Sequence, residues 1–288
     1  MSVKGLWLFL ATGVFWGLPY FFIEWALESF STQNIVFARV VIGAAVLLPY
    51  AALTGGLKPA LKAWPYVLAF AVLEMVGPWF LITEAQKHIT SGLAGLMVAT
   101  VPFFAVAILA IFFKDRTALK PVPLTGMIIG FIGVVTLVGI DSVFGLVDPF
   151  WVGAVVLASI GYAIAPIMAN LKMREVPSSG VIGLSMLMVS IVYAPFSLPT
   201  LPAEIIAGPT THSWVGILVL GLVCSALAFV LFFDLIKEIG PAKASLITYI
   251  NTAVAISLGT LFLAEPITPG LLIAVSYTHL TLPTNREV

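Results

Sequence analysis

Residues 229–268 read FVLFFDLIKEIGPAKASLITYINTAVAISLGTLFLAEPIT, and they decide how the rest of the chain is interpreted. An apolar run is followed by a charged break at Gly240-Pro241, and a second apolar run ends at Glu265-Pro266. A similar stretch lies earlier, at residues 80–116: FLITEAQKHITSGLAGLMVATVPFFAVAILAIFFKDR. Identical residues coincide at Lys87 and Lys237, Ile89 and Ile239, Ala94 and Ala244, Leu96 and Leu246, and Phe112 and Phe262. The polar interruptions of the two stretches coincide as well as the identical residues. The pattern therefore predicts two copies of one membrane unit.

The composition supports an integral membrane protein. Hydrophobic residues make up 61% of the chain and charged residues only 9%, whereas soluble domains carry about 25% charged residues. The 13 basic residues balance the 13 acidic ones, so nothing indicates a nucleic-acid partner. The single cysteine, Cys224, lies in an apolar run and is expected to be a packed membrane-helix residue.

Apolar runs of about 20 residues, the length that crosses a bilayer core, recur along the chain with short Gly-, Pro- and charge-rich connections. The β-barrel alternative would need alternating segments, which are absent from these runs. We therefore predict an all-α fold, with a tenth span beginning near Pro269 and the others near residues 5–26, 33–53, 65–86, 92–113, 122–140, 150–170, 179–198, 213–236 and 242–264.

The distribution of Lys and Arg predicts the orientation, because cytoplasmic loops are enriched in both. With the N-terminus inside, only Lys87 falls in an outside loop. The inside segments then hold Lys4, Lys58, Lys62, Lys114, Arg116, Lys120, Lys172, Arg174, Lys237 and Lys243.

The first unit is predicted at residues 1–146 and the second, incomplete unit at 147–275. Since five spans is an odd number, the second unit is inverted relative to the first, as in many secondary transporters. A weaker echo pairs Phe15-Trp16-Gly17 with Ile160-Gly161-Tyr162. Only the seven residues from Pro269 to Val275 are typical of a membrane helix, so the tenth helix is expected to be truncated or replaced. Residues 276–288 are interpreted as a non-native tail, with a native short element as the alternative.

Two charged residues inside spans are the first candidate site residues, because burying charge in lipid is costly. Arg39 lies within the second span and Glu74 at the middle of the third. One interpretation pairs them across adjacent helices. The other places both in a cavity, where Arg39 attracts a substrate carboxylate and Glu74 an amino group or a proton.

Deep aromatic and polar residues form the second group of candidates. Trp16, Tyr20, Trp79, Tyr162 and Tyr249 are either interfacial anchors or cavity residues. Near them, prolines free backbone carbonyls and bend the helices. Mid-span Asn251 either bonds a neighbouring helix or contacts substrate. A glycine stripe that includes Gly126 and Gly130 favours close helix packing within the chain, which leaves a monomer or a weak dimer.

Enzyme motifs are missing from the sequence. It contains no HExxH, no Gly-x-Ser-x-Gly and no GxxxxGK pattern, so we expect no catalytic residues, no metal and no cofactor.

These features resemble the EamA-type branch of the drug/metabolite transporter superfamily. The resemblance rests on two units that each close on an acid, at Asp115 and Glu265, on Trp16-Gly17, and on Thr100-Val101-Pro102. Thr100 joins the candidate residues through that last motif. The family often has proline where this chain has Thr252.

The resemblance is nearest to the bacterial aromatic amino acid exporters. It implies ten helices, a central cavity, and export of amino acids or related metabolites across the bacterial inner membrane by alternating access. Its partners would be a small-molecule substrate, the bilayer and, if transport is coupled, protons. A nucleotide-sugar or drug carrier of the same fold and a membrane enzyme are the alternatives.

Overall fold

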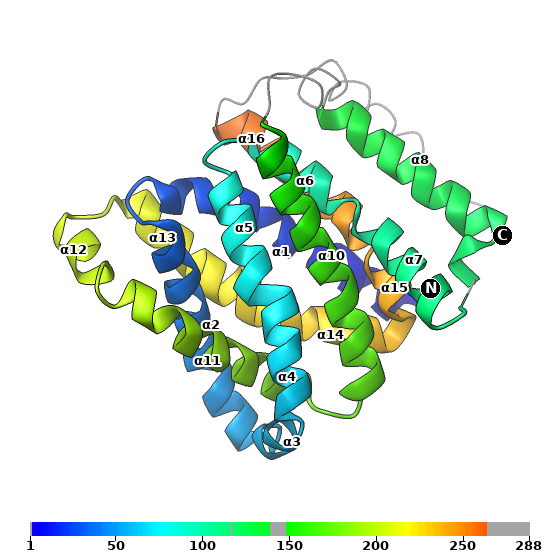
Figure 1. Ribbon diagram of the computed structural model, residues 1–288, viewed down its shortest axis with the longest axis horizontal. Coiled ribbons are helices and arrows are strands. Elements are labelled where there is room, and N and C mark those ends of the chain that lie inside the picture. Colours follow the sequence, from blue (N-terminus) through cyan, green and yellow to red (C-terminus); the bar gives the residue numbers. More distant parts are fainter. Residues whose placement is uncertain (1, 116, 139–147, 264–288) are drawn as a thin grey trace.

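The computed structural model describes residues 2–115, 117–138 and 148–263, and Figure 1 shows how their helices are arranged. Within these ranges every regular element is a helix. Eight stretches of helix are long and apolar enough to cross a membrane. This finding confirms the predicted all-α membrane class. The predicted tenth helix and the tail at 276–288 lie outside the described residues.

The first half, as we call the described residues up to 138, contains four membrane-length stretches and a further helix. The third stretch, Trp64–Ala85, and the fourth, Ser91–Phe112, are each built from consecutive helical segments. The elements are α1 (Val3–Leu27), α2 (Thr32–Leu53), α3 (Leu57–Lys62), α4 (Trp64–Ala71), η1 (Val72–Val76), α5 (Gly77–Ala85), α6 (Ser91–Val98), α7 (Val101–Phe112), η2 (Thr117–Leu119) and α8 (Pro121–Val138).

The second half, from residue 148, repeats this arrangement closely. Its third and fourth stretches, Thr211–Ile239 and Pro241–Phe262, are again composite. The elements are α10 (Pro149–Lys172), α11 (Ser178–Ser197), α12 (Leu201–Ile206), α13 (Thr211–Gly221), η3 (Leu222–Leu227), α14 (Ala228–Ile239), α15 (Pro241–Ala244) and α16 (Ile247–Phe262). The spans predicted within the described residues therefore lie where helices are found.

A π-helical segment interrupts the third stretch of each half. These segments, η1 and η3, begin at residues that the repeat aligns, Val72 and Leu222. In η1 the N–H of Gly77 donates to the carbonyl of Val72, and in η3 the N–H of Ala228 donates to Val223. Both bonds span five residues, which defines a π-helix, and such bulges occur frequently at functional sites.

The two halves are interlocked, because helices of each half pack between helices of the other. α1 contacts α13, α14 and α16 of the second half, whereas α10 contacts α5, α6 and α7 of the first half. α2 and α11 pack extensively on each other. The first helix of each half therefore lies against the third and fourth spans of the other half.

Two glycines allow this close approach. Gly17 of α1 faces the Val254 side chain and the Asn251 carbonyl of α16. Gly161 of α10 faces the carbonyl of Leu73 in η1. A β-carbon at either position would overlap these atoms, so a larger residue would force the two halves apart.

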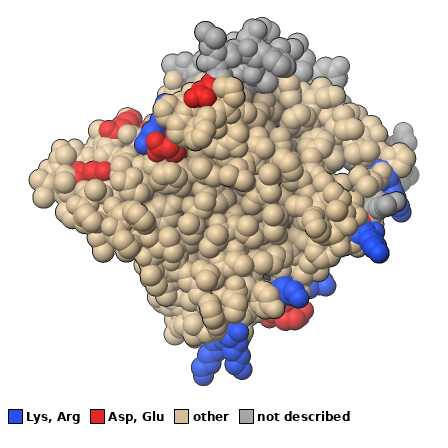
Figure 2. All heavy atoms as spheres, viewed as in Figure 1, with Lys and Arg blue, Asp and Glu red and all other residues tan. Residues whose placement is uncertain are grey.

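The surface agrees with a membrane setting. On the face shown in Figure 2, charged side chains lie at the edges and leave a broad uncharged area between them. Large exposed apolar side chains such as Leu157, Ile191 and Phe196 cover α10 and α11. A soluble protein rarely exposes so much contiguous apolar surface. The orientation of the N-terminus stays a prediction.

Candidate functional site

A cavity lies between the two halves, lined by their first, third and fourth spans and by α2. The space between the lining atoms, which includes solvent at the cavity opening, is about 840 Å³. The structure brings together at this cavity most of the candidate residues from the sequence: Trp16, Tyr20, Arg39, Glu74, Trp79, Tyr162 and Asn251.

Arg39 of α2 is held by contacts to both halves. Its guanidinium Cζ lies 3.6 Å from the centre of the Trp79 ring in α5, a stacked cation–π contact. Its Nε donates a 2.6 Å hydrogen bond to Ser225 Oγ in η3. Arg39 is only 5% exposed, and a buried charge is costly unless such partners are present. The remaining guanidinium N–H groups are available to an anionic ligand.

Glu74 lies in η1 and is 3% exposed. Its Oε2 atom is buried and has no hydrogen-bond partner among the residues that the structure describes. Both Arg39 and Glu74 are described, yet no ion pair joins them, so the direct pairing considered from the sequence is not found. A carboxylate that lines a cavity with a free oxygen can accept a proton or bind a cationic group.

The π-helix explains why Glu74 and Trp79 share the cavity wall. In an α-helix, residues five apart point about 140° away from each other. The wider turn of η1 brings them to one side. Pro78 favours this arrangement, because proline has no N–H for the α-helical ladder and its ring clashes with the preceding turn. Gly77-Pro78 is thus the local sequence signal for η1.

Aromatic rings form most of the remaining wall. The Trp16 indole lies 5.0 Å from the Phe229 ring and 4.4 Å from the Phe232 ring, centre to centre. Its Nε1 donates to the carbonyl of Cys224 in η3, at 3.1 Å. Tyr162 of α10 lines the same cavity. The rings therefore surround the charged pair.

The fourth span of the second half contributes polar groups. Ser245, Thr248 and Asn251 all line the cavity. The two hydroxyls donate to backbone carbonyls within their own turns. Asn251 accepts only a long 3.4 Å bond from Thr252, so its amide is the more available of these polar groups. Neither interpretation of Asn251 from the sequence is excluded by this position.

A polar layer lies beyond the Tyr20 and Ile82 end of the cavity. Gln86 Nε2 donates to the carbonyl of Tyr20 at 2.7 Å and to Glu24 Oε1 at 3.0 Å. Glu84 accepts hydrogen bonds from Thr32 and Lys87. This layer ties α1 and α2 to the end of the third span. The cavity extends the other way, to Pro241 and Ser245.

Thr100 and Tyr249 lie outside the cavity lining. The Thr100 hydroxyl donates to the carbonyl of Met97, at the junction of α6 and α7. Tyr249 points toward α8, where its hydroxyl donates to the carbonyl of Met127 and its ring faces Gly130. In this structure both hydroxyls therefore form hydrogen bonds to backbone carbonyls rather than facing the cavity.

Several lining residues were missed from the sequence, although the repeat contains the signal for them. Phe229 aligns with Trp79, and Phe232 with Ile82. In the fourth spans, Thr248 and Asn251 align with Val98 and Val101, and all four line the cavity. Applying the repeat to the candidate residues Trp79 and Asn251 would have identified Phe229 and Val101. Ser225 gave no such signal, since it binds Arg39 without lining the cavity.

Within the described part of the chain, no cluster of three His, Cys, Asp or Glu residues could hold a metal ion. The site is thus defined by one cation, one carboxylate and aromatic walls inside a bundle of membrane-length helices. That combination places the protein in the class of polytopic membrane proteins with a central polar cavity.

The chain belongs to the EamA-like transporter family, whose profile matches residues 3–139 and again residues 149–280. This match confirms the resemblance described from the sequence. The inner membrane transporter YedA of Escherichia coli K12 is 25% identical over 251 residues, which cover 86% of this chain and 79% of YedA. A probable terminal-alkyne amino-acid exporter of Streptantibioticus cattleyicolor is 22% identical over 267 residues, covering 91% and 86%.

A solved crystal structure has the same fold. It aligns with a TM-score of 0.74 at 19% identity and covers 96% of this chain and 94% of its own. At this identity the match shows the fold alone. The family and the relatives' names indicate a membrane transporter.

Proposed function

We propose that this protein is a secondary carrier that exports small amphipathic metabolites across the bacterial inner membrane, with aromatic amino acids as the leading substrates. The observation that carries the proposal is the cavity itself. An unpaired carboxylate on Glu74 and a stacked guanidinium on Arg39 lie among aromatic side chains in one space. An amphipathic zwitterion has the complementary groups.

In this proposal each part of the substrate has a partner. Arg39 takes the substrate carboxylate through its free N–H groups, since guanidinium–carboxylate pairs are strong and directional. Glu74 takes the ammonium group or a proton. The rings of Trp16, Trp79 and Phe229 supply stacking and edge contacts, which favour an aromatic side chain by about 0.5–1.5 kcal/mol for each ring pair.

Alternating access would then be motion between two inverted units, residues 1–146 and 147–275. The Lys and Arg distribution places Lys87 outside and Lys237 inside. In that orientation the polar layer of Gln86, Glu24 and Glu84 closes the outer end, and the cavity extends inward to Ser245. The structure would then correspond to the state that receives substrate from the cytoplasm.

A nucleotide-sugar or phosphorylated-sugar carrier is less well supported. Such dianionic substrates call for several cations, and Arg39 is the one Lys or Arg among the described residues that line the cavity. A membrane enzyme would need a nucleophile and a base in contact. The cavity hydroxyls of Ser245 and Thr248 donate instead to backbone carbonyls.

Efflux from proteoliposomes tests the proposal and the role of Glu74. Vesicles loaded with radiolabelled phenylalanine, tyrosine or tryptophan should release them faster with the protein than without it. If export is proton-coupled, Glu74→Gln should abolish the response of the efflux rate to a pH gradient. Glu175→Gln, at an exposed loop carboxylate, is the matched control and should leave that response intact.

The outcomes separate the alternatives. Efflux that ignores a pH gradient in the unmodified protein would indicate facilitated diffusion. Coupling that survives Glu74→Gln would exclude Glu74 as the proton carrier. Chemical turnover of a substrate without flux would favour an enzyme.

A further inference from the structure

The π-segment η1 that carries Glu74 lies between two helices of the other half. On one side, Gly161 of α10 allows close contact with the Leu73 carbonyl. On the other side, the hydroxyl of Tyr193 in α11 donates a 2.7 Å hydrogen bond to the carbonyl of Val76, the last residue of η1. Tyr193 is 6% exposed and does not line the cavity.

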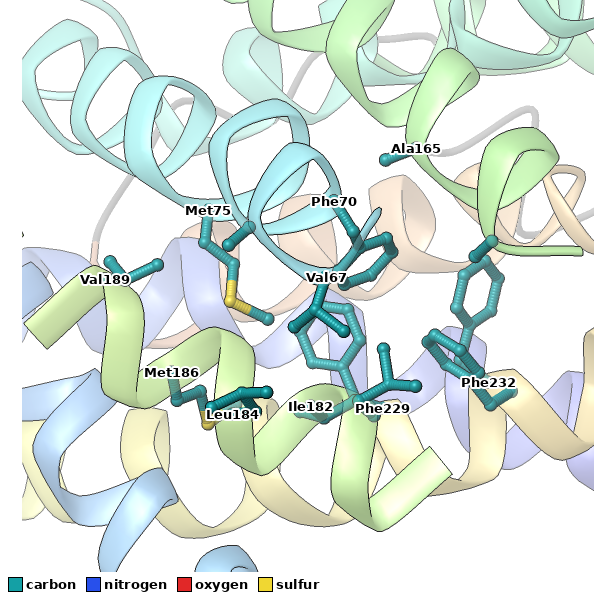
Figure 3. Packing of buried hydrophobic residues seen from close by; sticks show 14 of the residues in the cluster. Val67, Phe70, Met75, Ala165, Ile182, Leu184, Met186, Val189, Phe229 and Phe232 are labelled. Carbon is teal, nitrogen blue, oxygen red and sulfur yellow. The ribbon is translucent and has the colours of Figure 1, made fainter. Parts of the chain in front are cut away.

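Packing reinforces the contact with α11. Met75, the residue after Glu74, is fully buried in the same apolar cluster as Met186, Val189 and Tyr193 of α11. Figure 3 shows its side chain directed from the third span toward α11. Neighbouring residues of η1 therefore make different contacts. Met75 and Val76 bind the segment to α11, whereas Glu74 lines the cavity.

The corresponding segment η3 is held differently. Ser225 in η3 donates its hydroxyl to the carbonyl of Leu220, five residues earlier, so this segment carries its own hydrogen-bond donor. Trp16 binds the neighbouring carbonyl of Cys224. The repeat aligns Ser225 with Met75, which has no hydroxyl. Both segments thus receive a donor from the other half, Trp16 for η3 and Tyr193 for η1, but only η3 adds a side-chain donor of its own.

A change in η1 would alter where Glu74 points. If the segment returned to α-helical bonding, the side chains before and after it would rotate relative to each other by about 100°, the angle of one residue. Glu74 and Trp79 could not then both face the cavity. The bond from Tyr193 opposes this change because it fixes the carbonyl at the end of the segment.

We propose that Tyr193 is a positioning residue that holds the Glu74 carboxylate in the cavity by anchoring the π-segment η1 to α11. Because α11 belongs to the other half, movement between the halves would be transmitted to Glu74 through this bond. The inference deepens the proposed function, on which the importance of Glu74 for transport rests. Its geometric part can be tested without any substrate.

The test measures how readily a cysteine at position 74 is reached from the cavity. Cys224→Ala removes the native thiol, and Glu74→Cys introduces the reporter. The rate of modification by N-ethylmaleimide is measured on the full chain in proteoliposomes. Tyr193→Phe is expected to slow modification at position 74 about fivefold to tenfold, the factor that one net hydrogen bond supplies.

Two controls make the result specific. Ser245→Cys, at a cavity residue in the fourth span of the second half, should be modified at the same rate with or without Tyr193→Phe. Tyr249→Phe removes another hydroxyl that donates to a backbone carbonyl, that of Met127 in α8, and should not alter modification at position 74.

The proposal predicts a slower rate at position 74 alone. Equal rates at position 74 with and without Tyr193→Phe would overturn it. Loss of modification at both positions 74 and 245 would also overturn it, because Tyr193 would then support the whole cavity rather than η1. Neither result depends on transport, so failure of the proposed function in the efflux assay is a separate outcome.

Discussion

The third spans of the two halves, Trp64–Ala85 and Thr211–Ile239, share a backbone but differ in chemistry. Each contains a π-segment at the position that the repeat aligns. In the first half this segment carries Glu74, one of whose oxygens has no hydrogen-bond partner within the described part of the chain. In the second half it presents Ser225, which is bonded to Arg39 and to the Leu220 carbonyl. The same backbone feature therefore carries a carboxylate oxygen without a described partner in the first half and a hydroxyl with two partners in the second half.

The fourth spans are divided in a similar way. Val98 and Val101 line the cavity from the first half, whereas the aligned Thr248 and Asn251 line it from the second half. A symmetric backbone with asymmetric side chains lets a cavity between two similar units distinguish the two ends of a substrate. This comparison leads to the following predictions.

Arg39→Gln should have the largest effect. It removes the cavity cation together with its stacking on Trp79, and a buried charge-assisted bond to substrate is worth about 1.5–3 kcal/mol. Converted to a ratio of rate constants, this free energy corresponds to a fall of roughly tenfold to 150-fold in kcat/KM for efflux of an amino acid. Lys58→Gln, at an exposed residue of α3, is the control. An equal loss in both variants would contradict the role of Arg39.

Ser225→Ala should have an intermediate effect. It removes the hydroxyl that accepts from Arg39 and donates to Leu220, so Arg39 loses its fixed orientation while its charge stays. We expect KM to rise about fivefold to tenfold, the equivalent of roughly 1–1.5 kcal/mol, with a smaller change in kcat. Ser225→Thr keeps the hydroxyl and should retain most of the affinity; if it behaves as Ser225→Ala does, the bond to Arg39 is not what matters.

Thr100→Val should have the smallest effect. Its hydroxyl bonds only the carbonyl of Met97 outside the cavity, and surface or peripheral substitutions of this kind change stability by about 0.5 kcal/mol. The efflux rate should stay within about twofold of the unmodified protein. A large rise in KM would mean that Thr100 reaches the substrate in another state of the transport cycle.

The sequence was most informative for charged residues inside membrane spans, because their burial in lipid costs free energy. Arg39 and Glu74 could be predicted as cavity residues because charge inside a membrane span needs a reason. From the sequence, Trp16 and Tyr162 could be either interfacial anchors or cavity residues. In the structure both line the cavity. Phe229 and Phe232 were missed, since an apolar ring in a membrane helix is indistinguishable by composition from a lipid-facing one.

The positions of Thr100 and Tyr249 relative to the cavity could not be read from the sequence, because the backbone departs from a regular helix. Breaks at residues 99–100 and 245–246 change the helical phase, so the side on which Thr100 or Tyr249 lies cannot be read from a regular period. The π-segments change it again. Pro78 signals the first of them, but the bonds from Trp16 to Cys224 and from Tyr193 to Val76 join distant parts of the chain. Such contacts between distant residues cannot be predicted from the sequence around either partner.

Counterflow of three related compounds tests the central claim most directly. Proteoliposomes preloaded with phenylalanine would be offered labelled phenylalanine, 2-phenylethylamine, which lacks the carboxylate, or 3-phenylpropionate, which lacks the ammonium group. If Arg39 and Glu74 bind the two ends of one substrate, phenylalanine should exchange at least about tenfold faster than either analogue, the factor for one lost charged contact. Equal exchange of all three compounds, or no exchange of phenylalanine, would contradict the account.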